Sequence, residues 1–255
     1  CACDPKPNLW RAATDNDGIK LWDGQDSKPL GRWLALGLDA VSEKQSPASI
    51  ETGTPGEILL TTRRHLSGRQ GRPMGIFETR FVFDARDSFL VRHRLEMNGP
   101  EFDDLPRVGV LWTLAAGLEN LRYFGLGPQE NYPDRQSGAL LGVHGGAVSS
   151  QFFPYVMPQE TAHHGGTRWV ELSSSDGRRL RFEFETPLGF SAIHFTPEML
   201  FAAKRQNDLK PAPETFLAID AAHRGLGSGS CGPDTLPKYQ TGPGPHEWSY
   251  RVRIS

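Results

Sequence analysis

From about residue 40 onward, apolar and polar residues alternate along most of the chain, and turn-forming residues separate the alternating stretches. Phe77, Thr79, Phe81 and Phe83, for example, fall on one side of such a stretch. A period of two is typical of antiparallel strands with one buried face. We therefore expect strands at residues 57–66, 76–84, 88–97, 107–114, 121–124, 168–173, 179–185, 190–195, 215–220 and 248–254.

Two short stretches have helical character instead. Leu30, Trp33 and Leu34 lie on one helical face, and Gly37 can end that helix. Thr196 is a suitable N-cap for a second helix over residues 198–205. At least ten strands and two short helices predict an all-β fold, a large antiparallel β-sandwich. We find no internal repeat or low-complexity linker, so we expect residues 1–255 to form one domain.

Composition narrows the classes of partner. The chain has 28 Gly and 20 Pro, which fits many turns, and its net charge of -2 argues against nucleic-acid binding. No apolar run reaches the length of a membrane helix and no signal peptide is visible, so we expect a soluble, cytoplasmic protein without a membrane partner. The chain opens on Cys1-Ala2-Cys3-Asp4 without Met, and we expect it to be an excised part of a longer polypeptide. Three cysteines, the third being Cys231, fit a reducing compartment.

A stiff polar loop follows the strand expected at residues 121–124. Pro128 and Pro133 each fix a backbone angle, and five polar side chains lie within seven residues. This loop is either a turn that satisfies its own hydrogen bonds, or a surface that binds sugar hydroxyls or docks another domain.

Residues 125–135 (GLGPQENYPDR) resemble a signature of the C-terminal domain of the large family 2 β-galactosidases. Three further segments resemble that domain in the same order. Residues 9–17 are similar to its WRAPTDND motif, with Ala13 where proline is usual, and residues 155–160, followed by Arg168-Trp169, are similar to its YVxPQE and RW motifs. Residues 223–227 (HRGLG) are similar to its H-x-G-x-G motif. The resemblance spans Leu9 to about Tyr239.

The resemblance implies a supersandwich of the galactose-mutarotase type within a β-galactosidase, which hydrolyses terminal β-D-galactosides such as lactose with retention. The two catalytic glutamates would lie in an upstream barrel, so no catalytic residue is carried over to this chain. No cofactor is implied for this chain, whereas Mg and Na would be bound by other domains. The implied partners are a galactoside, the upstream domains and further copies of the full enzyme in a homo-oligomer.

The resemblance also names candidate substrate-binding residues. In some relatives a tryptophan that follows the H-x-G-x-G motif stacks on the sugar, and its counterpart here is Cys231. A thiol cannot supply the same flat surface, so we expect the acceptor preference to differ. Asp15 and Asn16 fall in a region that forms a mobile active-site loop in some relatives, and they are the other two candidates.

Acidic residues do not reveal a catalytic pair. Asp103 and Asp104 fall in an expected exposed loop, and Glu130 and Asp134 fall in the polar loop, where hydrogen bonding or solvation accounts for them. The acidic run that begins at Asp15 lacks the spacing of a calcium loop.

Histidines do not match known metal motifs either, so we expect ordinary hydrogen bonds or solvent contacts for His144, His163, His164, His194 and His223. Cys231 would be nucleophilic only beside positive charges, so we expect it to be inert.

Two other functions stay open. A free-standing carbohydrate-binding or aldose mutarotase-like sandwich would need a general acid and a general base, for which His194 and Glu183 are the candidates. Alternatively the domain chiefly buries apolar surface against a neighbouring domain or subunit, with Trp10, Trp22 and Trp33 as expected exposed contacts.

Overall fold

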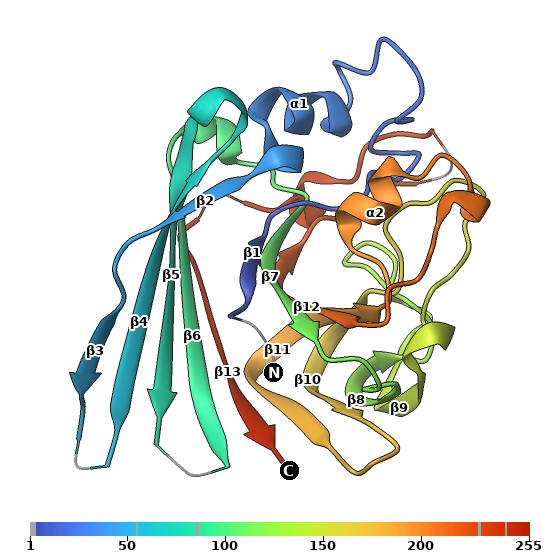
Figure 1. The fold of residues 1–255 in the computed structure, drawn as a ribbon. Coiled ribbons are helices and arrows are strands. Elements are labelled where there is room, and N and C mark those ends of the chain that lie inside the picture. Colours follow the sequence, from blue (N-terminus) through green and yellow to red (C-terminus); the bar gives the residue numbers. More distant parts are fainter. Residues whose placement is uncertain (1–3, 55, 85–86, 229–230, 243) are drawn as a thin grey trace.

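The structure is a computed structural model that describes residues 4–54, 56–84, 87–228, 231–242 and 244–255 (Figure 1). Cys1, Cys3 and most of the turn expected at residues 85–87 lie outside this part. The described residues contain two α-helices, α1 (Pro29–Leu36) and α2 (Pro197–Ala202). Their strands are β1 (Lys6–Asn8), β2 (Ser42–Gln45), β3 (Ser49–Thr52), β4 (Ile58–Ser67), β5 (Pro73–Phe83), β6 (Ser88–Met97), β7 (Arg107–Leu114), β8 (Asn120–Gly127), β9 (Leu140–Ala147), β10 (His164–Ser173), β11 (Arg179–Ile193), β12 (Thr215–His223) and β13 (His246–Ile254).

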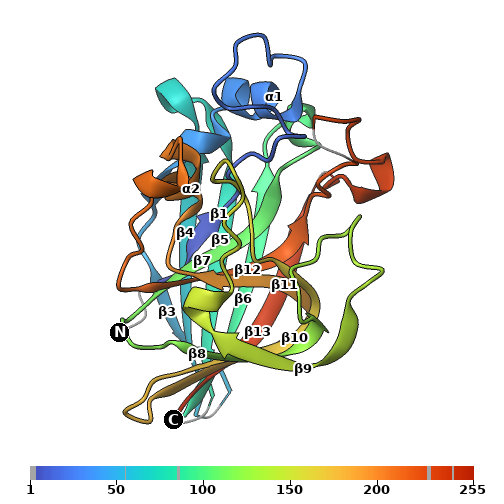
Figure 2. The ribbon, with the colours of Figure 1, turned by 90° about the vertical axis from the view of Figure 1, so that its right-hand side faces the viewer.

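These strands form one continuous 13-stranded sheet in which the strand pairings are antiparallel. Its main path runs β1-β7-β12-β11-β13-β6-β5-β4-β2. β10 pairs with β11 and continues the sheet through β8 to β9, which lie together at the front in Figure 2. In Figure 1 the short strand β3 and the long strands β4 to β6 form one side of the molecule, and β7 to β12 form the other.

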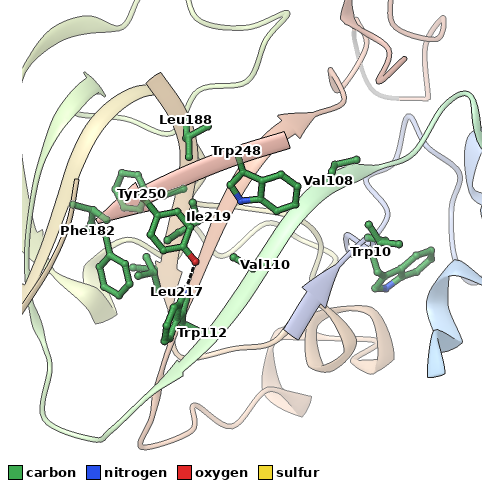
Figure 3. Close-up of a cluster of buried hydrophobic side chains, with 14 of the residues drawn as sticks. Trp10, Val108, Val110, Trp112, Phe182, Leu188, Leu217, Ile219, Trp248 and Tyr250 are labelled. Atoms are coloured by element: carbon green, nitrogen blue, oxygen red, sulfur yellow. Dashed lines mark hydrogen bonds between the residues drawn. The ribbon is translucent and has the colours of Figure 1, made fainter. Parts of the chain in front are cut away.

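A single hydrophobic cluster between the two sides of the sheet contains most of the buried aromatic residues (Figure 3). The Nε1 of Trp112 on β7 donates a 2.8 Å hydrogen bond to the hydroxyl of Tyr250 on β13. β7 and β13 are not neighbours in the sheet, so this bond crosses the core. The sheet is therefore folded over its own inner face, and the predicted all-β antiparallel sandwich with two short helices is confirmed.

Expected strands are present both where the sequence alternates, as in β6, and where it is continuously apolar, as in β7. β6 and β7 have the predicted bounds, whereas the two strands expected at residues 179–185 and 190–195 are one strand, β11. Pro187 lies between the stretch that pairs with β13 and the stretch that pairs with β12. Its missing N–H therefore falls where β11 changes partners, and the strand continues.

Both expected helices are present. The amide of Gly37, in the left-handed conformation with φ 78°, caps α1 by donating to the carbonyls of Trp33 and Leu34. Thr196 caps α2 through a 3.2 Å bond from the Met199 amide, but the helix ends at Ala202 rather than Arg205. Neither helix has the length or the apolar character needed to cross a membrane, within the described ranges.

The expectation of three exposed tryptophans was wrong for two of them. Trp10 and Trp33 are 4% and 1% exposed, whereas Trp22 is 65% exposed. Trp10 packs edge-on against Trp33 and against Phe201, with ring centroids 6.3 and 5.1 Å apart. This aromatic packing joins α1 to α2 and to the N-terminal segment, so Trp10 and Trp33 belong to the core.

Candidate functional site

Four segments that are far apart in the sequence meet at one open cleft with a volume of about 480 Å³. The loops that carry its lining residues lie at the upper right of Figure 1. Each of the four motifs singled out in the sequence contributes to its wall, and the lining residues are Thr14, Asp15, Asn16, Asp134, Arg135, Tyr155, Gln159, Glu160, Leu226, Gly227 and Ser228. Loops at one end of a rigid sheet are a common position for ligand sites.

Asp134 joins the polar loop to the segment at residues 223–227. Its carboxylate accepts hydrogen bonds from the amides of Leu226 and Gly227, at 2.9 and 2.7 Å, and from the hydroxyl of Thr235 at 2.8 Å. Burial raises the pKa of this carboxyl, but the bonds from the two amides and the hydroxyl outweigh burial and lower the pKa below its ordinary value. Asp134 therefore stays ionised and holds two walls of the cleft together.

The two glycines of the HRGLG segment are required by this contact. A Cβ atom on Gly225 would lie 2.6 Å from the Asp134 carboxylate carbon and 2.5 Å from the Thr235 hydroxyl. Gly227 has φ +85°, a conformation that residues with side chains rarely adopt. The segment can therefore follow the carboxylate closely only with glycine at both positions.

Asn16 connects the N-terminal segment to the loop after β12. Its Nδ2 donates to the carbonyl of Leu226 at 3.0 Å, and its Oδ1 accepts from the amide of Gly232 at 2.9 Å. The neighbouring Asp15 amide donates to Oε1 of Gln159 at 3.2 Å, and both residues line the cleft. Cys231 is exposed and directly precedes Gly232. Asp15 and Asn16 thus lie in the cleft wall, and Cys231 directly precedes Gly232, whose amide Asn16 binds.

The floor beneath this wall contains buried ion pairs. Arg11 is fully buried and forms a bidentate ion pair with Asp17, in which Nη2 lies 2.6 Å from Oδ1 and Nε lies 3.0 Å from Oδ2. The same guanidinium donates to the carbonyls of Arg224 and Gly225. Paired and hydrogen-bonded in this way, the buried charges fix the position of the N-terminal segment relative to the HRGLG segment.

A second buried cluster lies below the cleft. Arg107 pairs with Asp220 at 2.6 Å and approaches Glu160 at 3.5 Å. His163 and His223 adjoin these carboxylates, with ring centroids 4.5 Å apart, and burial holds the pKa of both imidazoles well below the ordinary value. Burial also raises the pKa of Asp220 to about 6. Because burial lowers both pKa values, both histidines are neutral; the Nδ1 of each ring donates to a backbone carbonyl, whereas the buried Nε2 atoms of both rings have no hydrogen-bond partner among the described residues.

Lys20 ties the loop that carries Asp15 and Asn16 to α2. Its Nζ lies 2.5 to 2.9 Å from four backbone carbonyls, those of Pro158, Leu200, Phe201 and Ala203. Burial lowers the pKa of Lys20 to about 8. The four carbonyls supply more acceptors than the ammonium has protons, so each proton can be donated to the backbone and the side chain fixes the loop in place.

The other acids assigned to hydrogen bonding have that role, but one of them lies in a different environment from the one expected. Glu130 accepts from the Ala162 amide at 2.6 Å and from the hydroxyls of Thr161 and Tyr155. Asp104, expected in an exposed loop, is buried and paired with Arg224 at 2.8 Å. The correction follows from Arg224, a buried cation 120 residues away whose charge requires a partner.

The two candidates for a mutarotase-like site are not brought together. They are eleven residues apart on and just after β11, which amounts to on the order of 30 Å along a strand. His194 contacts Glu119 at 2.8 Å, and Glu183 pairs with Arg181 and Arg253. Opposed proton donors on one sugar ring require a much shorter separation. Among the described residues, no three His, Cys, Asp or Glu side chains are placed to hold a metal.

Sequence reasoning missed the residues that organise the cleft, namely Arg11, Asp17, Arg107, Asp220 and Arg224. Each is a charged residue fully buried by contacts that are distant in the sequence. One signal was available for three of them: Arg11 and Asp17 lie inside the motif at residues 9–17, and Arg224 lies inside the motif at residues 223–227.

The fold and the cleft define an all-β sandwich with a polar cleft built from loops. The sequence model of the family described as beta galactosidase small chain matches residues 3–254. The chain therefore belongs to the beta-galactosidase small chain family.

Curated relatives support this assignment. A beta-galactosidase of Arthrobacter sp. (strain B7) is 30% identical over 273 residues, which cover 98% of this chain and 26% of the relative. A beta-galactosidase of Staphylococcus xylosus is 31% identical, over 97% of this chain and 24% of the relative. The chain thus spans about a quarter of the length of these relatives. A solved GalM/aldose epimerase homologue from C. elegans overlaps 82% of this chain and 69% of its own, with 11% identity and a TM-score of 0.39, a likeness too weak for any conclusion.

Proposed function

We propose that this chain is the C-terminal domain of a β-galactosidase and that its cleft forms part of the mouth of the active site. The full enzyme would hydrolyse terminal β-D-galactosides such as lactose with retention, using two glutamates of an upstream barrel. The observation that carries the proposal is the meeting of all four family-like motifs at one cleft, where Asp15 and Asn16 lie side by side.

The roles of the cleft carboxylates support catalysis elsewhere. A retaining glycosidase needs two free carboxyl groups about 5 Å apart. Of the three acids that line the cleft, Asp134 is bound by two amides and a hydroxyl, and Glu160 is paired with Arg107. Asp15 is the remaining acid among the described lining residues, and its carboxylate can accept a hydrogen bond from a ligand hydroxyl. One such acid can bind a sugar but cannot complete the double displacement.

Asp15 and Asn16 would bind substrate hydroxyls or position the loop that does so. Cys231 would occupy the place of a stacking tryptophan, where its small side chain leaves room for bulkier acceptor groups. The remaining partners, namely upstream domains and further copies of the full enzyme, and the cytoplasmic location also belong to this proposal. So does the assignment of residues 1–255 to one domain, which a single calorimetric unfolding transition would support.

The test is kinetic and uses the longer β-galactosidase polypeptide. Replacing Asp15 by Ala removes one hydrogen bond to substrate, and we expect KM for galactosides to rise about tenfold with little change in kcat, because one charged hydrogen bond contributes about 1.5 kcal/mol. Asp103→Ala, at an exposed carboxylate that does not line the cleft, is the matched control. An unchanged KM in the Asp15 variant would contradict the role of this cleft.

A further inference from the structure

A second cavity, with a volume of about 240 Å³, opens into the core near the end of β13. Its lining includes Ser255, and the C-terminus lies at the bottom of both Figure 1 and Figure 2, whereas the loops of the polar cleft lie toward the top. The two sites are therefore at different ends of the molecule, and the cavity shares no lining residue with the cleft.

The inner wall of this cavity is apolar. Trp112, Leu118, Phe182 and Val252 are all buried core residues that line it, and Figure 3 shows Trp112 and Phe182 near each other at one side of the core cluster. The indole N–H of Trp112 is already donated to Tyr250, so it offers no hydrogen bond to the cavity. A wall of this kind disfavours water, which needs two to four polar partners, and favours a hydrocarbon group.

Two arginines, each beside an acidic residue, lie at the mouth of the cavity. Arg178 and Arg179 line it, and a Cβ on Gly117 would lie only 3.5 Å from Nη2 of Arg178, so this guanidinium reaches the loop beside Ala115 and Leu118. Arg178 pairs with Asp176 at 2.9 Å and Arg179 approaches Glu171 at 3.8 Å. Both arginines are more than half exposed, and ion pairs at such exposed positions contribute little, so a ligand anion can compete for either guanidinium.

We propose that this cavity is a binding site for a small amphipathic anion, with an alkyl or aryl group against Trp112 and Phe182 and a carboxylate at Arg178 and Arg179. A water molecule occupies about 30 Å³ in the liquid and a methylene group is of similar size, so the cavity holds roughly eight such groups. Medium-chain carboxylates match both the volume and the charge. The site is independent of galactoside binding.

The first experiment titrates this 255-residue chain with sodium octanoate by isothermal calorimetry. We expect saturable binding of one octanoate per chain, with a negative heat-capacity change from apolar burial. In the series from hexanoate to octanoate the affinity should rise about fourfold per methylene group, since each buried methylene contributes about 0.8 kcal/mol. Above about eight carbons the affinity should level off. Absence of saturable binding, or an affinity that does not depend on chain length, would overturn the proposal.

The second experiment tests the charge at the mouth. Octylammonium has the same chain with opposite charge and should bind at least several-fold more weakly than octanoate. The double replacement Arg178→Gln with Arg179→Gln should weaken octanoate about three- to tenfold and leave octanol unchanged. Arg92→Gln, at an exposed arginine on β6, is the matched control. Equal affinities for octanoate and octylammonium would show that the arginines do not select an anion.

The third experiment fills the cavity. Ala115 lines the cavity in a loop and is half-buried, so Ala115→Trp can place an indole in the space that the ligand would occupy. We expect this variant to unfold cooperatively and to lose octanoate binding. Binding of octanoate that persists undiminished in a folded Ala115→Trp variant would place the ligand elsewhere. If that variant does not fold, the arginine variants and the chain-length series still decide the proposal.

Discussion

Removing the Asp134 carboxylate should detach the polar loop from the HRGLG segment. In the Asp134→Ala variant the amides of Leu226 and Gly227 lose their acceptor, and so does the hydroxyl of Thr235. Hydrogen bonds to a charged group contribute about 1.5 to 3 kcal/mol each, but the half-buried site lets water replace part of them. We therefore expect the free energy of unfolding to fall by about 3 kcal/mol at pH 7.

The pH dependence of the free energy of unfolding provides a second, independent test of the role of Asp134. Because the folded state lowers the pKa of Asp134, its stabilisation is fully present above the pKa of an unfolded aspartate, about 3.9, and is lost as the pH falls through the lower folded value. The difference in stability between the wild type and Asp134→Asn should therefore shrink in acid.

Urea denaturation at pH 7 and at pH 3 measures both effects. Asp103→Ala, at an exposed carboxylate, is the control and should change stability by less than about 0.5 kcal/mol. The reasoning fails if Asp134→Ala and Asp103→Ala are equally stable, or if the effect of Asp134→Asn is the same at both pH values.

Four further predictions concern the buried contacts. Arg107→Met leaves the Asp220 carboxylate buried without its cation and should cost about 3 to 5 kcal/mol in urea unfolding, a loss that a second change, Asp220→Asn, should partly restore. Gly225→Ala should lower the melting temperature by several degrees in calorimetry, because its Cβ would lie 2.6 Å from the carboxylate carbon of the polar loop. Lys20→Met removes the bonds to four carbonyls, and thermolysin should cleave the loop at residues 14–28 faster than in the wild type while other sites are cut at unchanged rates. Burial lowers the pKa of His93 to about 3, so unfolding stability should fall as the pH drops below about 6.5, by up to 1.4 kcal/mol per unit, and a folded His93→Gln variant should show a shallower fall.

The sequence predicted most of the sheet, because the alternation of apolar and polar residues indicates which face of a strand is exposed to solvent. It did not predict β9, whose residues include Gly142, Gly145 and Gly146 and show no clear alternation. It also divided β11 at Pro187, since nothing local indicates that the strand changes partners there. Strand pairing joins residues that are far apart in the sequence, whereas a sequence pattern reports only the local alternation of apolar and polar residues.

The cleft was predicted in its parts but not in its organisation. Asp15 and Asn16 were identified as candidates, and the structure places both in the cleft wall. The contact that builds the wall joins Asp134 to residues 92 and 93 positions later, and spacing in a single sequence cannot reveal it. Trp33 shows an avoidable error: it shares a helical face with Leu30, and that pattern already indicated burial.

Central to the proposed function is the claim that the acids which cleave the galactoside lie outside this chain. The most direct test measures hydrolysis of a chromogenic β-galactoside by the purified 255-residue chain and by the longer polypeptide in parallel. We predict turnover by the longer polypeptide and none above the buffer rate by this chain. Turnover that copurifies with this chain and is abolished by Asp15→Ala would contradict the claim.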